Sequence, residues 1–190
     1  MTTRVLFVCT GNICRSPIAE VQFEAMGLAD VSVSSAGVLF DDREASDGAV
    51  EWAKRNDLDL RGHRSRSITR AMLSEQDVII AMEPRHVREV VAMHDAAWHC
   101  TFTLRELAAA AVRAGPRGAG ESLGAYLARL SIGRKRADLM IDAEALSIAD
   151  PYQQSAQVYD RTGYAIAEAL TQVTASLWPM SSSEFRAGSV

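Results

Sequence analysis

The stretch that decides the fold reads Cys9-Thr10-Gly11-Asn12-Ile13-Cys14-Arg15-Ser16. It follows residues 5–8, Val-Leu-Phe-Val, an apolar run typical of a strand buried on both faces of a parallel sheet. Ser16 and Pro17 then open a helical pattern, with Ser16 expected as the N-cap. A loop between such a strand and such a helix points its backbone N–H groups, and the positive end of the helix dipole, at its own centre. The expected guest of this loop is an anion.

Two reactive side chains stand at a fixed separation in the loop. Cys9 lies six residues before Arg15, so a thiol and a guanidinium can reach the same bound phosphate group. Cys14 has no such partner, because the residue six places after it is Glu20. Loop amides, the helix N-terminus and Arg15 all favour the thiolate, which is the nucleophilic form of cysteine. We therefore expect Cys9 to be the nucleophile and residues 10–16 to bind phosphate.

Residues 5–20 resemble the low-molecular-weight protein tyrosine phosphatase family without a gap. The family's motif of a cysteine, five residues, an arginine and a serine is matched by Cys9, Arg15 and Ser16. The resemblance implies hydrolysis of phosphotyrosine in proteins through a cysteinyl-phosphate intermediate. It implies no cofactor and no metal, because Arg15 and the loop amides would supply the charge stabilisation.

The resemblance also assigns supporting residues around the nucleophile. It implies that Ser35, at the end of a second strand, hydrogen-bonds Asn12 and helps to hold the loop open. His63 stands where the family has a histidine in the hydrogen-bond network behind the loop. Ser16 would stabilise the Cys9 thiolate as it departs from phosphorus.

The cysteine count is three, with Cys9, Cys14 and Cys100 as its members. Three cysteines are too few for a disulfide scaffold, and an odd number cannot all pair. No spacing of cysteine and histidine residues matches a structural zinc site. Cys9 and Cys14 are close enough in sequence for a reversible disulfide. In the family that the chain resembles, the second loop cysteine is linked to such oxidative protection.

The whole chain has 190 residues, 48% hydrophobic content and a formal net charge of −4. This length suits one well-cored domain, expected over residues 1–178, and the slight acidity argues against nucleic-acid binding. No run approaches the roughly 18 to 20 apolar residues that a membrane span needs, and residues 1–4 lead directly into a strand. The expected protein is a cytoplasmic monomer or weak dimer without membrane insertion.

Strand patterns recur at residues 31–36, 77–82 and 100–104, with helical patterns between them. This alternation predicts an α/β three-layer sandwich with a four-stranded parallel sheet, and the resemblance makes it phosphotyrosine phosphatase I-like. Ligands bind such sheets at the carboxyl ends of the strands, which is where Cys9 lies. His86 and His94 fall on a helix that begins after Glu83, have no partner at metal-ligand spacing, and are expected at the surface.

Residues 104–148 depart from the compact family pattern and are interpreted as an extra helical insertion. Helical patterns at 104–113, 123–130 and about 137–146 are separated by helix-breaking stretches. We interpret the insertion as a surface elaboration, with a lid or partner platform beside the active site as the alternative. Residues 179–190, rich in serine and glycine, are expected to form a flexible tail.

An acid motif follows this insertion. Asp150 precedes Pro151, which stiffens the backbone beside the carboxyl group. Together with the N-terminal loop, this pair resembles the family's acid motif, which implies that Asp150 is the general acid and base. Phe40 and Tyr152 would wall a slot that admits phosphotyrosine and leaves phosphoserine too short to reach the nucleophile. Gln153 stands where the family usually has a second aromatic residue and would form a polar wall.

Alternatives to phosphotyrosine hydrolysis stay open. Phosphoarginine phosphatases of the same fold tend to have threonine where this chain has Ile13, a difference that favours tyrosine. Arsenate reductases of the fold use further cysteines, and here only Cys100 lies downstream. A catalytically idle phosphotyrosine-binding scaffold would have no need of Asp150. The expected partner is a tyrosine-phosphorylated protein, with a bacterial-type tyrosine kinase as one candidate.

Overall fold

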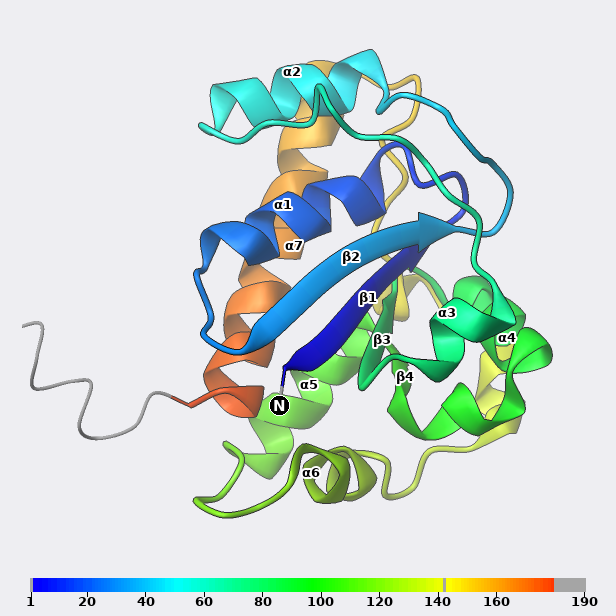
Figure 1. Ribbon diagram of the computed structural model, residues 1–190, viewed down its shortest axis with the longest axis vertical. Helices are drawn as coiled ribbons and strands as arrows, with labels where there is room; N and C mark the ends of the chain where they lie inside the picture. Colours follow the sequence, from blue (N-terminus) through cyan, green and yellow to red (C-terminus); the bar gives the residue numbers. More distant parts are fainter. Residues whose placement is uncertain (1, 142, 180–190) are drawn as a thin grey trace, which may run out of the picture.

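A twisted parallel sheet organises the chain, as Figure 1 shows for the computed structural model, which describes residues 2–141 and 143–179. Its strands are β1 (Thr3–Cys9), β2 (Val31–Gly37), β3 (Val78–Ala81) and β4 (Thr101–Thr103). All neighbouring strands pair in parallel, in the order β2-β1-β3-β4. The predicted four-stranded parallel sheet is therefore confirmed.

The central strand β1 owes its position to its apolar run. Residues 5–8 are fully buried, because alternate side chains enter opposite cores. Val5 and Phe7 belong to the larger core cluster, whereas Leu6 and Val8 belong to the smaller one. This strand delivers Cys9 to the carboxyl edge of the sheet.

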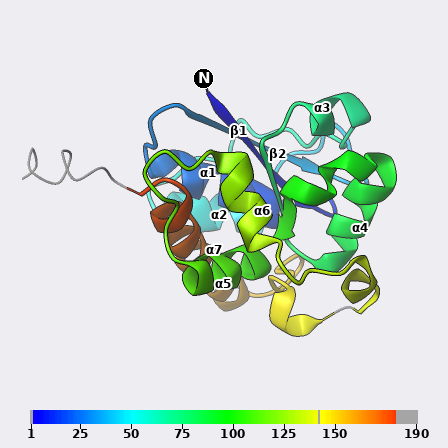
Figure 2. The same cartoon turned by 90° about the horizontal axis from the view of Figure 1, so that it is seen from below.

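Helices cover both faces of the sheet and complete the three layers (Figures 1 and 2). One layer holds α1 (Arg15–Ala25), α5 (Leu104–Ala114) and α7 (Ala156–Leu177), with α2 (Asp47–Arg55) packed on α7. The other layer holds α3 (Arg70–Ser74), α4 (Pro84–Met93) and the 3₁₀ helix η1 (Asp95–Cys100). The short helix α3 was not predicted from the sequence, but the three-layer α/β sandwich was.

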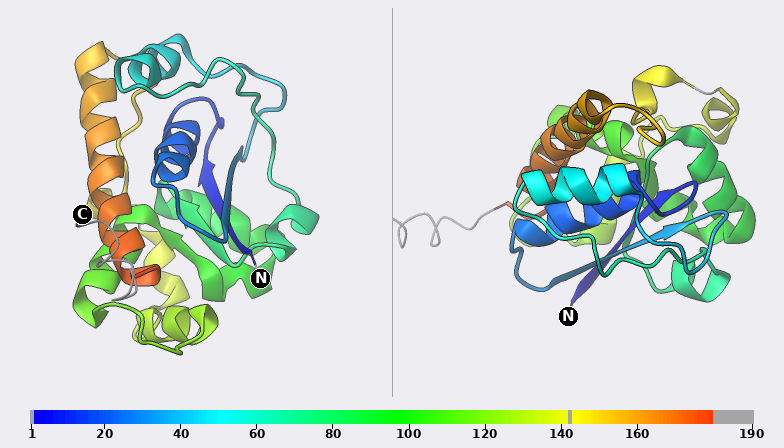
Figure 3. Two further views of the ribbon diagram at one scale, coloured as in Figure 1. Left: turned by 60° about the vertical axis from the view of Figure 1, so that its left-hand side comes forward. Right: turned by 90° about the horizontal axis from the view of Figure 1, so that it is seen from above.

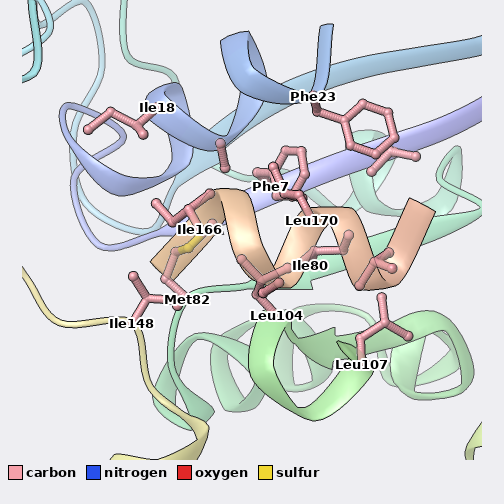
Figure 4. Close-up of a cluster of buried hydrophobic side chains, with 14 of the residues drawn as sticks. Phe7, Ile18, Phe23, Ile80, Met82, Leu104, Leu107, Ile148, Ile166 and Leu170 are labelled. Atoms are coloured by element: carbon pink, nitrogen blue, oxygen red, sulfur yellow. The ribbon is translucent and has the colours of Figure 1, made fainter. Parts of the chain in front are cut away.

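The larger core lies between the sheet and the layer of α1, α5 and α7 (Figure 4). Phe7 of β1 meets Phe23 of α1 edge to face, with ring centroids 5.8 Å apart and an interplanar angle of 65°. Leu104 of α5 and Leu170 of α7 close the cluster from the helix side. This packing fixes α1, and with it the loop that precedes α1, against the sheet.

The structure corrects the interpretation of residues 104–148 as a surface elaboration. Helix α5 buries Leu104, Leu107 and Ala111 in the larger core, and α6 (Leu123–Leu130) adds Tyr126 and Leu127. Both helices are thus part of the hydrophobic core, because their apolar residues recur at helical spacing on one face. Helix α7 packs along α5 and runs much of the height of the molecule (Figure 3).

The remainder of that region is more exposed. The pattern at about 137–146 is divided into two short 3₁₀ helices, η2 (Arg136–Met140) and η3 (Glu144–Leu146), neither of which contains a buried residue. Arg134 anchors the segment, because its guanidinium lies 4.1 Å from the ring centroids of both Trp98 and Phe102 and pairs with Glu106 at 2.6 Å. The predicted tail, 179–190, lies outside the described residues except for Pro179. Within the described ranges, no helix has the length and apolar character to cross a membrane.

One close approach in this fold gives a stability prediction. A Cβ atom at Gly163 of α7 would lie 2.3 Å from Cε2 and Cζ2 of Trp52, a buried residue of α2. We expect Gly163→Ala to lower the free energy of unfolding by about 1 to 3 kcal/mol, because the buried indole has little space to move. Urea denaturation of the variant and the parent measures this difference in unfolding free energy.

The matched control is Gly124→Ala, since Gly124 lies on the exposed side of α6 and a Cβ there meets nothing within 4 Å. This change is expected to leave the midpoint unchanged or to raise it, because alanine favours helix. Equal midpoints for Gly163→Ala and the parent would show that α2 and α7 are not packed in this way.

Candidate active site

The phosphate-binding loop, residues 9–16, joins the end of β1 to the start of α1. Helix α1 begins at Arg15 with Cys14 as the N-cap and no side-chain cap hydrogen bond, so the expected N-cap role of Ser16 is wrong. Ser16 is fully buried and lies under the loop, because its hydroxyl is used by the site instead of by the helix end. Asn12 has a φ of 52°, the left-handed backbone that asparagine tolerates, and this curves the loop.

The Cys9 thiol lies at the base of this loop and is 3% exposed. Its Sγ atom accepts a hydrogen bond from the Asn12 backbone N–H at 3.2 Å and lies 3.0 Å from Ser16 Oγ. Both neighbours can donate hydrogen bonds to the sulfur.

Asn12 is the centre of the network behind the loop. Its Nδ2 donates to Ser35 Oγ at 2.7 Å and to Ser16 Oγ at 3.0 Å, and its Oδ1 accepts from the Arg66 backbone N–H at 3.1 Å. The contact between Asn12 and Ser35 that the family resemblance implied is present. Asn12 is fully buried, so these bonds fix the loop in place.

His63 contacts the backbone of the same loop. Its Nε2 is 2.6 Å from the Asn12 carbonyl oxygen. Burial lowers the pKa of His63, so the neutral ring that donates to this carbonyl is the favoured form. The structure therefore brings His63 to the loop, and its effect on turnover stays a prediction.

Arg15 links the loop to the distant acid motif. The residue is 1% exposed. Its guanidinium donates to Asp150 Oδ2 at 2.9 Å and to the Ile148 carbonyl at 3.1 Å, and it also pairs with Glu83. The Ile148 backbone N–H in turn donates to the Met82 carbonyl at 2.8 Å. The segment before Asp150 is thereby held on the end of β3, and the acid lies beside the phosphate loop as expected.

Two site residues that the sequence reasoning missed follow β3 directly. Glu83 pairs with Arg15 and Arg85, and although burial alone raises its pKa, these hydrogen bonds lower it. His86 is 1% exposed and its Nε2 lies 2.8 Å from Thr10 Oγ1, so the expected surface position of His86 is wrong. The available signal was the place of these polar residues just after a buried parallel strand, at the edge where ligands bind.

A cavity of about 170 Å³ opens above Cys9. The expected slot residues Phe40 and Tyr152 line it, together with Ile13 and Arg43, and the Arg43 guanidinium lies 5.2 Å from the Phe40 ring centroid. The expected polar wall at Gln153 is not there. Gln153 has a φ of 60°, which turns the chain after Tyr152. The residue lines a neighbouring hollow of about 600 Å³ instead.

Cys14 belongs to a different set of contacts. Its Sγ lies 3.0 Å from Ser46 Oγ and 3.5 Å from the Tyr159 hydroxyl, which are themselves 2.9 Å apart. Burial raises the pKa of the Cys14 thiol. Cys9 and Cys14 are both free thiols here, and the disulfide between them stays a prediction.

A parallel sheet delivers a cysteine from its first strand into an anion-binding loop, with an arginine six residues later and an aspartate beside it. This arrangement is suited to attack by a cysteine nucleophile on a phosphoryl group. The profile of the low molecular weight phosphotyrosine protein phosphatase family matches residues 4–114. The chain belongs to this family, and the matched part ends with α5.

Curated relatives agree with this assignment over about half of the chain. The low molecular weight protein-tyrosine-phosphatase Etp of Escherichia coli K12 is 41% identical over 90 residues, which is 47% of this chain and 60% of Etp. Wzb of the same strain is 36% identical over 94 residues, which is 49% of this chain and 63% of Wzb. The matched stretch thus spans less than two thirds of either relative.

Solved structures are similar over almost the whole chain. The arginine phosphatase YwlE from Geobacillus stearothermophilus is 26% identical with a TM-score of 0.70, and the likeness covers 92% of each chain. A low molecular weight protein tyrosine phosphatase from T. tengcongensis is 28% identical with a TM-score of 0.66, covering 90% of this chain and 97% of that one. The phosphotyrosine phosphatase I-like fold extends beyond the stretch that the family profile matches.

Proposed function

We propose that this protein hydrolyses phosphotyrosine in proteins through a cysteinyl-phosphate intermediate. The observation that carries the proposal is the convergence of Cys9, Arg15 and Asp150 on one cavity of about 170 Å³. The expected partner is a tyrosine-phosphorylated protein, and a bacterial-type tyrosine kinase is the candidate that the family resemblance suggests.

In the first step the Cys9 thiolate attacks phosphorus in line with the leaving oxygen. The Arg15 guanidinium and the loop amides stabilise the equatorial oxygens, and the Asp150 carboxylic acid gives its proton to the leaving tyrosine oxygen. Asp150 already lies 2.9 Å from Arg15, so a phosphoryl group at the guanidinium is within reach of the acid. The P–O bond breaks and an S–P bond forms.

In the second step a water molecule attacks the cysteinyl-phosphate. Asp150, now ionised, removes a proton from this water, and the S–P bond breaks to release inorganic phosphate. Ser16 Oγ lies 3.0 Å from Cys9 Sγ and donates to the sulfur as the thiolate returns. The protein is then ready for another turnover.

The slot supports phosphotyrosine as the substrate. Cys9 is buried at its base, while Phe40 and Tyr152, which are 39% and 47% exposed, stand at its rim. A flat aromatic ring can pass between them and reach the thiolate, whereas the short phosphoserine side chain cannot. Phosphoarginine is the second candidate, because its long side chain could also span the slot and because the similar YwlE is named an arginine phosphatase.

The test is a comparison of phosphorylated peptides of one sequence under reducing conditions. We expect release of phosphate from the phosphotyrosine peptide and much slower release from the phosphoserine peptide. Faster release from a phosphoarginine peptide would assign the second candidate. Tight binding of the phosphotyrosine peptide without hydrolysis would identify a scaffold instead of an enzyme.

Asp150→Asn tests the general acid. We expect kcat to fall by about 10²- to 10⁴-fold for a phosphotyrosine peptide, since the amide cannot give up a proton to the leaving oxygen. The loss should be smaller for an activated aryl phosphate, whose leaving group needs less protonation. Asp30→Asn, an exposed turn residue with a φ of 56°, is the matched control and should retain full activity. Equal losses with both substrates would contradict the role.

A further inference from the structure

His86 is a buried polar residue that the proposed mechanism does not use. It lies in the first turns of α4 and is 1% exposed. Among the described residues its ring makes one hydrogen bond, between Nε2 and Thr10 Oγ1 at 2.8 Å. Its Nδ1 is also buried and has no hydrogen-bond partner among the described residues. A buried ring with a single contact, directed at the residue after the nucleophile, calls for a physical reason.

The surroundings of His86 decide which nitrogen carries the proton. Burial, reinforced by the nearby Arg15 guanidinium, lowers the pKa of His86 to about 3, so the ring is neutral near pH 7 and has one N–H group. A proton on Nδ1 would be a buried donor without an acceptor, which is rarer in proteins than an under-used acceptor. The proton is therefore assigned to Nε2, which donates to Thr10 Oγ1.

Thr10 lies between His86 and the cavity in which a ligand would bind. Its backbone carbonyl accepts hydrogen bonds from the Val38 N–H at 2.8 Å and the Leu39 N–H at 3.1 Å, so its main chain is fixed. Thr10 lines the cavity above Cys9. Once the hydroxyl oxygen accepts from His86, the hydroxyl proton is free to be donated elsewhere.

We propose that Thr10 Oγ1 donates a hydrogen bond to a phosphoryl oxygen, and that His86 is the positioning residue that orients it through Nε2–H. The proposal rests on the proposed function in one respect, because it needs the loop to bind a phosphoryl group. It adds a side-chain donor to the backbone amides and Arg15. It also gives a role to the contacts between the start of α4 and the phosphate loop, where Glu83 pairs with Arg15 and His86 hydrogen-bonds Thr10.

Binding of inorganic phosphate, followed by calorimetry on the full chain, tests the proposal without turnover. Thr10→Val keeps the shape of the side chain and removes the donor, so we expect phosphate affinity to fall roughly 10- to 100-fold, the loss typical of one hydrogen bond to a charged group. His86→Leu should give a similar loss. The double variant should be no weaker than either single variant, because both changes remove the same interaction.

Two further variants separate positioning from simple packing. His86→Gln can still donate an amide N–H to Thr10 and should recover most of the phosphate affinity. His99→Leu, at an exposed histidine of η1, should match the parent. If His86→Leu does not fold, Thr10→Val and His86→Gln decide the question.

The outcomes distinguish this proposal from the proposed function. Phosphate affinity in Thr10→Val equal to that of the parent would overturn the Thr10 donor, whatever the parent hydrolyses. Additive losses in the double variant would overturn the coupling of His86 to Thr10. A parent that binds phosphate in a Thr10-dependent way but hydrolyses no aryl phosphate would support this proposal and contradict the proposed function alone.

Discussion

Replacement of Cys9 by serine will abolish hydrolysis of aryl phosphates while leaving the fold intact. A serine hydroxyl is not ionised near neutral pH, so the loop loses its nucleophile, and we expect kcat to fall by at least about 10⁴-fold, the order of loss when a covalent nucleophile is removed. The substituted Oγ can keep the contacts with the Asn12 N–H and with Ser16. The midpoint of thermal unfolding is therefore expected to stay near that of the parent.

Cys100→Ser is the matched control for this change. Cys100 is a partly buried thiol at the end of η1, and its Sγ donates to the Ala97 carbonyl at 3.4 Å, a bond that a hydroxyl can also make. Full activity is expected for this variant. Substantial hydrolysis by folded Cys9→Ser under the same assay would remove the cysteinyl-phosphate mechanism from the proposal.

The nucleophile loop could be predicted because its parts are contiguous in sequence. A buried strand, the loop of residues 9–16 and the helix α1 follow one another, so local rules place Cys9 and Arg15 without knowledge of the rest of the fold. Asp150 lies far along the chain, and only the resemblance to a family connected it to the loop. Its contact with Arg15 depends on the anchoring of the Ile148 backbone to β3, which no local pattern encodes.

Other features could not be predicted for identifiable reasons. His86 was expected at the surface because it has no partner at metal-ligand spacing in the sequence, whereas its partner in the fold is the Thr10 hydroxyl, 76 residues away. Gln153 was expected in the slot wall because it stands where the family usually has a second aromatic residue. The positive φ of its backbone is not visible in the sequence. Helices α5 and α6 were interpreted as part of a surface insertion, although the family profile includes α5 and the spacing of Leu104, Leu107 and Ala111 indicates a buried face.

Gly37 is a residue that neither motif reasoning nor the hydrogen-bond network assigns to the site. It ends β2 beside Cys9, and a Cβ atom at this position would lie 2.8 Å from the Asn12 backbone nitrogen and 2.9 Å from Gly11 C and Thr10 O. Real Cβ atoms essentially never come so close to backbone atoms. The phosphate loop therefore occupies space that only glycine leaves free.

Gly37→Ala is expected to displace this loop. A shift of the loop by about 1 Å can cost 10²-fold in rate, so kcat/KM for an aryl phosphate should fall by about that factor or more. The cost in unfolding free energy should stay near the roughly 1 to 3 kcal/mol of an overpacked site, so the variant should remain folded. Activity and urea denaturation, measured on the same preparation, separate the two effects.

Gly62→Ala supplies the matched control for Gly37→Ala, since a Cβ at Gly62 meets nothing within 4 Å. It should leave both rate and stability unchanged. If Gly37→Ala retained a kcat/KM close to that of the parent, the contact of β2 with the phosphate loop would not restrict the loop. If it lost stability without losing rate per folded molecule, Gly37 would serve the packing of the sheet alone. A loss of rate in a folded variant would instead show that the closeness of β2 sets the loop's curvature, and that Gly37 belongs with Asn12 and Ser35 among the residues that shape the anion site.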